Sequence, residues 1–343
     1  MQFGLILPIQ AQGVDLDRLW QELRAETAAA EAAGFDAVFL TEFHQARGGA
    51  LVSPMLLGAA LLQGTDRIRF GTAVLAAPLH HPVRVAEDLL MLDWISRGRV
   101  ILGLGIGHQR QDFAAFGVPH AERAAVFEEF LDVLEACLQT RPFAHAGRYI
   151  RAEGAITPPP YTRPRPPIWI GAHGPRGLAR AARRADRWIC DPQRDVLTLA
   201  RLAQHYRAEC DSAGRPARIG LFREGWIGES RLECERVWGA HALAVHRLYF
   251  NVGTYRREYE PWVEKVRERK DFTFDLVARD RFLYGSGADI LADLRYWSEL
   301  TGADYVAVRM RQPGGPPHGA VLGAIERFGA EVIAPLAAQD EGD

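Results

Sequence analysis

Short apolar runs alternate with longer segments of helical pattern along almost the whole chain, and this alternation limits the fold more than any other feature of the sequence. A run that is apolar at nearly every position is typical of a parallel strand covered on both faces. Eight such runs occur, and a segment with helical periodicity follows each of them. The predicted strands cover residues 2–7, 35–40, 68–75, 99–104, 168–170, 187–190, 219–227 and 305–310, and the predicted helices cover residues 17–33, 54–63, 82–95, 121–138, 175–185, 196–213, 229–245 and 320–335.

Eight strand–helix units in 343 residues match the repeat count of the (β/α)8 TIM barrel. The competing architecture is a doubly wound open sheet. That fold normally carries a glycine fingerprint directly after its first strand, and none follows residues 2–7. We therefore predict the α/β class, with a (β/α)8 TIM barrel that has insertions between its strands.

Two stretches interrupt the repeat. Residues 140–167 are rich in proline, arginine and aromatic residues, which indicates a loop or a hairpin. Residues 246–286 place aromatic residues between charged ones, and a segment of this kind forms either a lid or interface element or a solvated helical excursion. We expect one barrel domain over residues 1–343 with insertions at about 140–167 and 246–286.

The bulk composition excludes some classes of function. A formal net charge of −2 gives no electrostatic basis for binding nucleic acid or an anionic membrane. The cysteines Cys137, Cys190, Cys210 and Cys234 have neither metal-ligand nor redox spacing. No apolar stretch is long and continuous enough to span a membrane. We expect a cytoplasmic protein in a reducing environment.

An acidic and an imidazole side chain follow the second predicted strand. Glu42 and His44 would lie at the rim of a barrel, where a carboxylate and an imidazole can share a proton or tune each other's pKa. The alternative is structural, with Glu42 in an ion pair to an arginine and His44 capping a helix. On the first interpretation both residues are catalytic candidates.

A histidine pair, His80 and His81, follows the third predicted strand. Two adjacent residues rarely present both rings to one metal ion, and no third ligand is evident in the sequence. A turn that leads into the helix starting at Pro82 explains the pair better. We predict no metal site.

Two glycine-rich segments are candidates for ligand contact. The segment 103–107 ends the fourth strand, and glycines such as Gly105 let a flat ligand approach the backbone. Gly174, Pro175, Arg176 and Gly177 join the fifth strand to its helix, and exposed amides, a helix N-terminus and an arginine suit an anion such as phosphate. The alternative is a Gly/Pro turn with a surface arginine.

A second positive charge for the same phosphate could come from Arg123, which follows the segment 116–119.

Taken together, these segments resemble the bacterial luciferase-like flavin-dependent monooxygenase family. The likeness runs from residue 1 to about residue 190 and resumes at residues 284–287 and 305–335. The order and spacing of the motifs carry it more than any single motif. The strongest stretch consists of Ile68 to Thr72, Glu87-Asp88, Leu92-Asp93, Gly98-Arg99, Asp112-Phe113 and Phe116-Gly117.

The resemblance implies a (β/α)8 barrel that binds reduced flavin mononucleotide (FMN) at its C-terminal face and uses O₂ to oxidise a small organic substrate. A separate flavin reductase would supply the reduced flavin, and the family favours a homodimer. The family's acidic-His-His motif falls on Glu42, Phe43 and His44. Phe43 therefore stands where luciferase has its catalytic histidine, and His44 is left to give acid–base help with Glu42 as its support.

The resemblance also implies the remaining contacts. The family often has a non-prolyl cis peptide under the flavin ring, which would fall at Ala73 and Val74. Phosphate binding would map onto residues 174–177 and Arg123. The candidates for substrate contact are Phe43, His80, His81, Gln109 and Arg309.

Two other functions stay open. The loop at residues 174–177 also resembles the branch of the family that uses the deazaflavin F420, which would mean hydride transfer without O₂. Alternatively, the replacement of the family histidine by Phe43 would suit a flavin-binding, subunit-like protein without catalytic activity.

Overall fold

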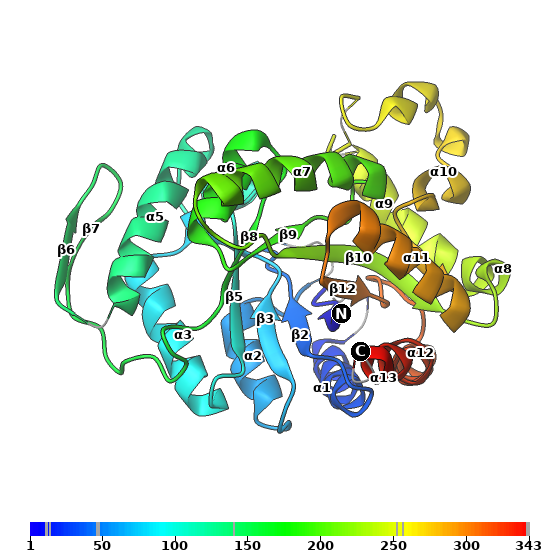
Figure 1. Cartoon of the computed structure of the whole chain (residues 1–343), viewed down its shortest axis with the longest axis horizontal. Coiled ribbons are helices and arrows are strands. Elements are labelled where there is room, and N and C mark those ends of the chain that lie inside the picture. The colour runs from blue at the N-terminus through cyan, green and yellow to red at the C-terminus, as the bar shows by residue number, and fades with distance from the viewer. Residues whose placement is uncertain are drawn as a thin grey trace.

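Parallel strands close into a barrel in the computed structural model, which describes residues 1–10, 13, 15–45, 49–139, 141–251, 253–255 and 257–340 (Figure 1). Hydrogen bonding runs β10-β12-β1-β2-β3-β5-β8-β9, and β9 pairs back with β10. Within the described residues the predicted (β/α)8 barrel is confirmed. The ring consists of β1 (Gln2–Leu7), β2 (Ala37–Leu40), β3 (Arg69–Thr72), β5 (Val100–Gly105), β8 (Ile168–Gly171), β9 (Arg187–Cys190), β10 (Ile219–Ile227) and β12 (Tyr305–Arg309).

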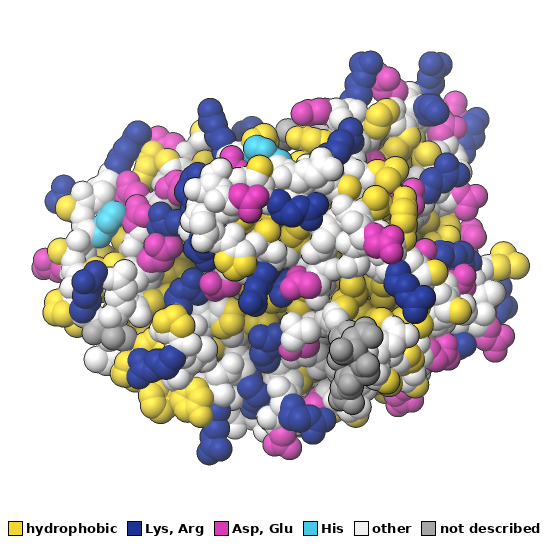
Figure 2. Space-filling view, in the orientation of Figure 1, with side chains coloured by type: hydrophobic (Ala, Val, Ile, Leu, Met, Phe, Trp, Pro, Cys, Tyr) yellow, Lys and Arg dark blue, Asp and Glu magenta, His cyan; other side chains and the backbone are white. Residues whose placement is uncertain are grey.

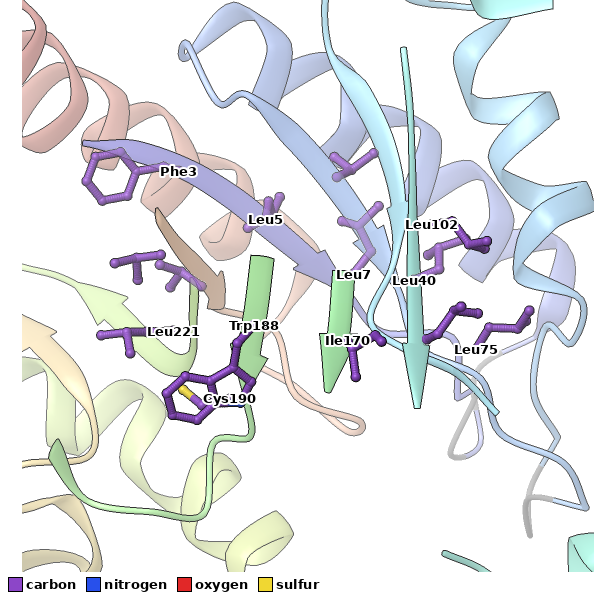
Figure 3. Close-up of a cluster of buried hydrophobic side chains, with 14 of the residues drawn as sticks. Phe3, Leu5, Leu7, Leu40, Leu75, Leu102, Ile170, Trp188, Cys190 and Leu221 are labelled. Atoms are coloured by element: carbon purple, nitrogen blue, oxygen red, sulfur yellow. The ribbon is translucent and has the colours of Figure 1, made fainter. Parts of the chain in front are cut away.

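Alternate side chains of each strand enter two separate apolar clusters. The inner cluster fills the barrel, where the rings of Phe39, Trp169 and Tyr305 pack with centroids 4.8–6.1 Å apart. The outer cluster lies between the strands and the helices, and Figure 3 shows part of it. Its labelled members are Phe3, Leu5, Leu7, Leu40, Leu75, Leu102, Ile170, Trp188, Cys190 and Leu221.

The helices that cover the barrel begin and end close to the predicted positions. Asp15 caps α1 by accepting the backbone N–H of Arg18, and Ser286 and Asp289 form a capping box at the start of α11. Residues 287–301, which carried no predicted element, form α11. The helices are α1 (Leu16–Ala32), α2 (Pro54–Leu62), α3 (Pro82–Ser96), α4 (Arg110–Ala115), α5 (Arg123–Leu138), α6 (Pro175–Arg184), α7 (Val196–Ser212), α11 (Gly287–Thr301), α12 (His318–Phe328) and α13 (Ala334–Asp340), with π-helical residues Gly329–Ile333 between the last two.

None of the helices in the described ranges is long and apolar enough to cross a membrane.

The first insertion contains a hairpin, which is one of the two forms that the sequence predicted for it. Strands β6 (Phe143–Ala146) and β7 (Arg151–Gly154) pair antiparallel and project at the left edge of Figure 1. The Glu129 carboxylate on α5 accepts three backbone N–H groups of the hairpin turn, those of residues 148–150, each at 2.9 Å. This one side chain therefore fixes the hairpin to the helix.

The second insertion forms its own small aromatic core. The rings of Tyr255 and Trp262 lie 5.1 Å apart, and those of Phe250 and Phe272 also lie 5.1 Å apart. Its strand β11 pairs with the last residues of β10, so β10 extends beyond the ring and supports the insertion. The elements from β10 onward are α8 (Arg231–Cys234), π-helical residues Glu235–Gly239, α9 (Ala240–Asn251), the 3-10 turns Pro261–Lys265 and Arg269–Asp271, α10 (Phe274–Ala278) and β11 (Leu283–Gly285).

The predicted third strand is divided in two. A cis peptide bond joins Ala73 and Val74, and pairing resumes in the short strand β4 (Leu75–Ala76). Next to this break the Thr72 hydroxyl donates to the Gly103 carbonyl at 2.7 Å and accepts the Gly103 N–H at 2.9 Å. The close approach of β3 to β5 leaves room only for glycine, because a Cβ on Gly103 would lie 1.9 Å from the Thr72 carbonyl oxygen.

We expect the Gly103→Ala substitution to destabilise the protein by about 3 kcal/mol, since the added methyl group meets backbone that must move. Gly323→Ala is the matched control. Its Cβ meets no atom within 4 Å, and alanine favours the helix it lies in, so it should be neutral or stabilising by roughly 0.5–1 kcal/mol. Urea unfolding midpoints measure both variants, and equal stability of the two would contradict the packing argument.

Candidate active site

One buried carboxylate joins two histidines at the C-terminal mouth of the barrel. Glu42 follows β2, and its Oε1 lies 3.0 Å from His44 Nε2 and 2.7 Å from His80 Nε2. His80 follows the β4 segment, 38 residues further along the chain. The structure therefore brings together the two catalytic candidates and one of the predicted substrate contacts.

The Glu42 carboxylate is held in its ionised form. Its side chain is 3% exposed, and the Ala76 backbone N–H donates to Oε2 at 2.5 Å. Burial alone would raise the pKa of Glu42, but the hydrogen bond and charge of His80, the Ala76 amide and the charge of His44 hold that pKa below its usual value. An ionised carboxylate only accepts hydrogen bonds, so each Nε2 must carry a proton.

The two imidazoles remain accessible from the mouth. The side chains of His44 and His80 are 16% and 27% exposed. When these rings are neutral, the Nε2 proton leaves Nδ1 as the acceptor, and no partner for Nδ1 is found among the described residues. The Phe116 ring, just after α4, lies 4.7 Å from the His44 ring. The cluster can thus accept or deliver a proton at the mouth of the barrel.

Two helix N-termini lie side by side at the same mouth. Arg180 Nε on α6 donates to Glu128 Oε1 on α5 at 2.7 Å, and Arg184 on α6 pairs with Asp132 and Glu135 on α5. Residues 128 and 180 lie equally far from the first residues of their helices, so α5 and α6 run parallel with their N-termini level. Both helix dipoles therefore present their positive ends to the same region.

The residues predicted to hold phosphate occupy this region. Gly174 precedes α6, a Cβ there would meet no atom within 4 Å, and Arg176 is exposed. Arg123 is the first residue of α5, where its Nη1 donates to the His120 carbonyl at 2.8 Å. The Nε of Arg123 is buried and has no hydrogen-bond partner among the residues that the structure describes. An unpaired guanidinium nitrogen beside two helix N-termini fits a phosphate group.

A second imidazole–carboxylate pair, missed from the sequence, borders this region. His173 Nδ1 contacts Asp191 Oδ2, and Asp191 Oδ1 accepts the backbone N–H groups of Gln193 at 2.7 Å and Arg194 at 3.2 Å. Burial opposes ionisation of Asp191, but His173 and the other donors hold its pKa well below the usual range. The signal in the sequence was an aspartate directly after a strand, close to the position of Glu42, which is the second residue after β2.

The residues predicted beneath the flavin ring pack against each other. Ala73 and Val74 share the cis peptide bond that the family resemblance implied. A Cβ on Gly105 would lie 2.4 Å from Val74 Cγ2, so the space beside this glycine is filled by Val74. Close packing thus gives a sufficient reason for glycine at position 105, and its contact with a cofactor stays a prediction.

The predicted substrate contact Arg309 is part of a buried ionic network. Its guanidinium forms two bonds with Glu224 and donates to the Tyr249 hydroxyl at 3.1 Å. The Gln312 amide also donates to Glu224, and Arg309 is 5% exposed. Burial opposes ionisation of Glu224, but the charge of Arg309 lowers its pKa to about 2. This network ties β10, β12 and α9 together at the barrel mouth.

His246 on α9 completes the network. It is fully buried, its Nδ1 contacts the Tyr255 hydroxyl, and its Nε2 lies 3.5 Å from Glu224 Oε1. Burial lowers the pKa of His246 to about 4, although Glu224 acts in the opposite direction. The sequence signal for this missed network was the pair Arg223-Glu224 inside an otherwise apolar strand.

The other candidates take no part in the hydrogen bonds of these clusters. Phe43 packs against the outer apolar cluster, His81 is exposed directly before α3, and Gln109 precedes α4. Among the described residues, no group of three or more His, Cys, Asp or Glu side chains is arranged to hold a metal ion.

A (β/α)8 barrel with an imidazole–carboxylate cluster and two level helix N-termini at its C-terminal mouth has the architecture of an enzyme. The family model for luciferase-like monooxygenases matches residues 1–304, and the chain belongs to that family. Members of the family are monooxygenases and oxidoreductases, with FMN-dependent and F420-dependent enzymes among the proteins similar to this chain.

Three similar proteins show this range. The 4-hydroxyprotoasukamycin monooxygenase of Streptomyces nodosus subsp. asukaensis is 30% identical over 88% of this chain and 83% of its own length. The F420-dependent glucose-6-phosphate dehydrogenase of Beutenbergia cavernae is 32% identical over 65% of this chain and 70% of its own. The solved FMN complex of the oxygenating constituent of 3,6-diketocamphane monooxygenase from Pseudomonas putida has a TM-score of 0.83 and 19% identity, covering 97% of this chain and 98% of its own.

The buried histidine makes the stability of the protein pH-dependent. The pKa of His246 in the folded state, about 4, lies below its ordinary 6.5, so the unfolded chain takes up the proton first and stability is lost as pH falls. As the pH falls from 7 to 5, we expect protonation of this histidine in the unfolded chain to lower the free energy of unfolding by about 2 kcal/mol. Urea unfolding at both pH values should show a smaller loss for His246→Asn than for wild type.

The matched control is His205→Asn, which changes an exposed histidine on α7. It should keep the wild-type pH dependence. An unchanged pH dependence in the His246→Asn variant would contradict the linkage.

Proposed function

We propose that this protein is a flavin-dependent monooxygenase that uses reduced FMN and O₂ to oxidise a small organic substrate. The observation that carries the proposal is the placement of the Glu42-linked imidazoles at the same barrel mouth as the level N-termini of α5 and α6. The first site can move protons and the second can hold a phosphate group. An FMN-dependent enzyme of this family needs both.

The phosphate of FMN would be held at the start of α6 and by arginine side chains. Gly174, Pro175 and Gly177 present backbone and the helix N-terminus, while Arg176 and the unpaired Nε of Arg123 supply positive charge. Residues 73–74 and Gly105 would lie against the ring system. When bound, reduced FMN supplies the electrons that activate O₂, while the protein orients the cofactor and excludes water.

In this proposal the side chains of the protein act as general acid and base. Glu42 fixes Nε2 of His44 and of His80, and the Nδ1 of His44 faces no competing partner among the described residues. His44 would therefore accept or donate the proton that the oxidation requires, with Glu42 stabilising its charged form. His80, His81, Gln109, Phe43 and Arg309 are proposed for substrate contact.

The partners follow from the same proposal. We expect a separate flavin reductase to supply the reduced cofactor, and we expect the active protein to be a cytoplasmic homodimer. Within this function the 246–286 insertion would cover the C-terminal mouth of the barrel, and residues 1–343 would act as one barrel domain.

A second candidate function is F420-dependent hydride transfer without O₂. The observation in its favour is the 32% identity with an F420-dependent dehydrogenase over 65% of this chain. Parallel titrations with reduced FMN and reduced F420, followed by exposure to O₂, discriminate the two. Oxygen uptake with FMN supports the monooxygenase, and tight F420 binding without oxygen uptake supports the dehydrogenase. Binding without turnover of any substrate would favour a non-catalytic protein.

The His44→Ala substitution tests the proton-handling role. We expect oxygen-dependent substrate turnover to fall roughly 10²–10⁴-fold, as for loss of a general acid or base, while FMN affinity is kept. The control His205→Ala removes an exposed histidine of α7 and should leave turnover unchanged. Full turnover in the His44→Ala enzyme would remove His44 from the mechanism.

The Arg176→Ala substitution tests the phosphate cradle. Loss of one charge-assisted contact should weaken FMN binding by about 1.5–3 kcal/mol, measured by fluorescence titration. Arg151→Ala, which removes an exposed arginine of the β6–β7 hairpin, is the control and should bind FMN as wild type does. Equal FMN affinity of the two variants would place the phosphate elsewhere.

A further inference from the structure

A cavity lined by arginines lies at the opposite, N-terminal mouth of the barrel. Its volume is about 610 Å³, within the usual range for sites that take small molecules. The cavity reaches the first residues of β1, β3 and β9, and the loops before β8 and β10 form its walls. Six of the lining residues are Arg69, Arg163, Arg165, Arg187, Arg215 and Arg218.

Ion pairs within the protein neutralise only part of this charge. Arg69 pairs with Asp36 and Arg187 with Asp304. Arg165 and Arg215 share one carboxylate, that of Asp186, at 2.6 Å and 3.6 Å. Three carboxylates thus pair with four of the six guanidinium groups, which leaves Arg163 and Arg218 without an ion-pair partner among the described residues.

Arg163 and Arg218 carry charge that nothing in the described part of the chain compensates. Both side chains are exposed and line the cavity, and neither has a hydrogen bond or ion pair to the described residues. They stand on different walls, since Arg163 precedes β8 and Arg218 directly precedes β10. Two guanidinium groups from different segments of the cavity wall, neither with a partner among the described residues, are suited to bind a small anion.

The walls are fixed in place before any ligand arrives. The buried Asp93 carboxylate on α3 accepts the Thr162 N–H at 2.8 Å and the Thr162 hydroxyl at 2.6 Å. Asp186 in turn accepts the Ile168 N–H at 2.7 Å. Both ends of the segment that carries Arg163 are therefore anchored, which lowers the entropy lost on binding.

The inner wall adds an aromatic surface. Trp169 lines the cavity, and the Arg187 guanidinium lies 5.2 Å from the Trp169 ring centre and 5.2 Å from that of Tyr305. Figure 2 shows basic side chains near the middle of one face with acidic ones among them. The described residues that line the cavity include no histidine or cysteine, and guanidinium groups are the most frequent polar groups there.

We propose that this cavity binds a small phosphorylated molecule, with Arg163 and Arg218 as the primary contacts. A phosphoryl group offers the charge and the oxygen geometry that paired guanidinium forks match. The site is distinct from the cradle at the other mouth, and it stands independently of the proposed oxidation.

Calorimetric titration of the intact protein with pyrophosphate tests the proposal. The Arg163→Ala/Arg218→Ala double variant should bind pyrophosphate at least tenfold more weakly than wild type, while its FMN affinity stays unchanged. The control Arg151→Ala should bind both ligands as wild type does. Raising the salt concentration should weaken the pyrophosphate binding of wild type.

Three results would overturn the proposal. These are the absence of pyrophosphate binding by wild type, equal affinity of wild type and the double variant, and loss of binding in Arg176→Ala instead, which would place pyrophosphate in the cofactor cradle. A titration with citrate separates phosphoryl recognition from general attraction of anions, because equal affinity for citrate contradicts a phosphoryl site. A failure of FMN binding with pyrophosphate binding intact would count against the proposed function alone.

Discussion

Hydrogen bonding between β9 and β10 closes the strands into a ring, and the position of each site depends on that closure. In a closed ring of parallel strands, all carboxyl ends meet at one mouth and all amino ends at the other. Glu42 and His80 reach one mouth for this reason, and Arg69 and Arg187 reach the other. The two mouths are separated by the inner cluster of aromatic and aliphatic side chains, so their chemistries can differ completely.

Two carboxylates, those of Glu42 and Glu224, are buried at the C-terminal mouth, and the side chains that contact each one determine what it can do. Glu42 bonds imidazoles that are partly open to solvent, so protons can be exchanged through them. Glu224 bonds Arg309, which keeps its proton at any ordinary pH, and lies 3.5 Å from the fully buried His246. The first carboxylate therefore suits catalysis, and the second suits anchoring the 246–286 insertion to the barrel.

Much of the fold was predictable because strand and helix signals are local. Continuous apolar runs identified the strands of the ring, and the predicted interruption at residues 140–167 contains a hairpin. Helix α11 carried no prediction, although Ser286 and Asp289 have the spacing of a capping box. The network around Arg309 was also missed, since its pairing with Glu224 depends on the register between β10 and β12.

The sequence by itself determined the fold class, the polar residues at the strand ends and the proximity of Glu42 to His44, because periodicity and a spacing of two residues are properties of the local chain. Only the tertiary structure decided that His80 shares the same carboxylate and that α5 and α6 bring their N-termini level. It also gathered arginines from distant segments into one cavity. These arrangements join residues that are far apart in the chain, so they depend on how the barrel closes and how the helices pack.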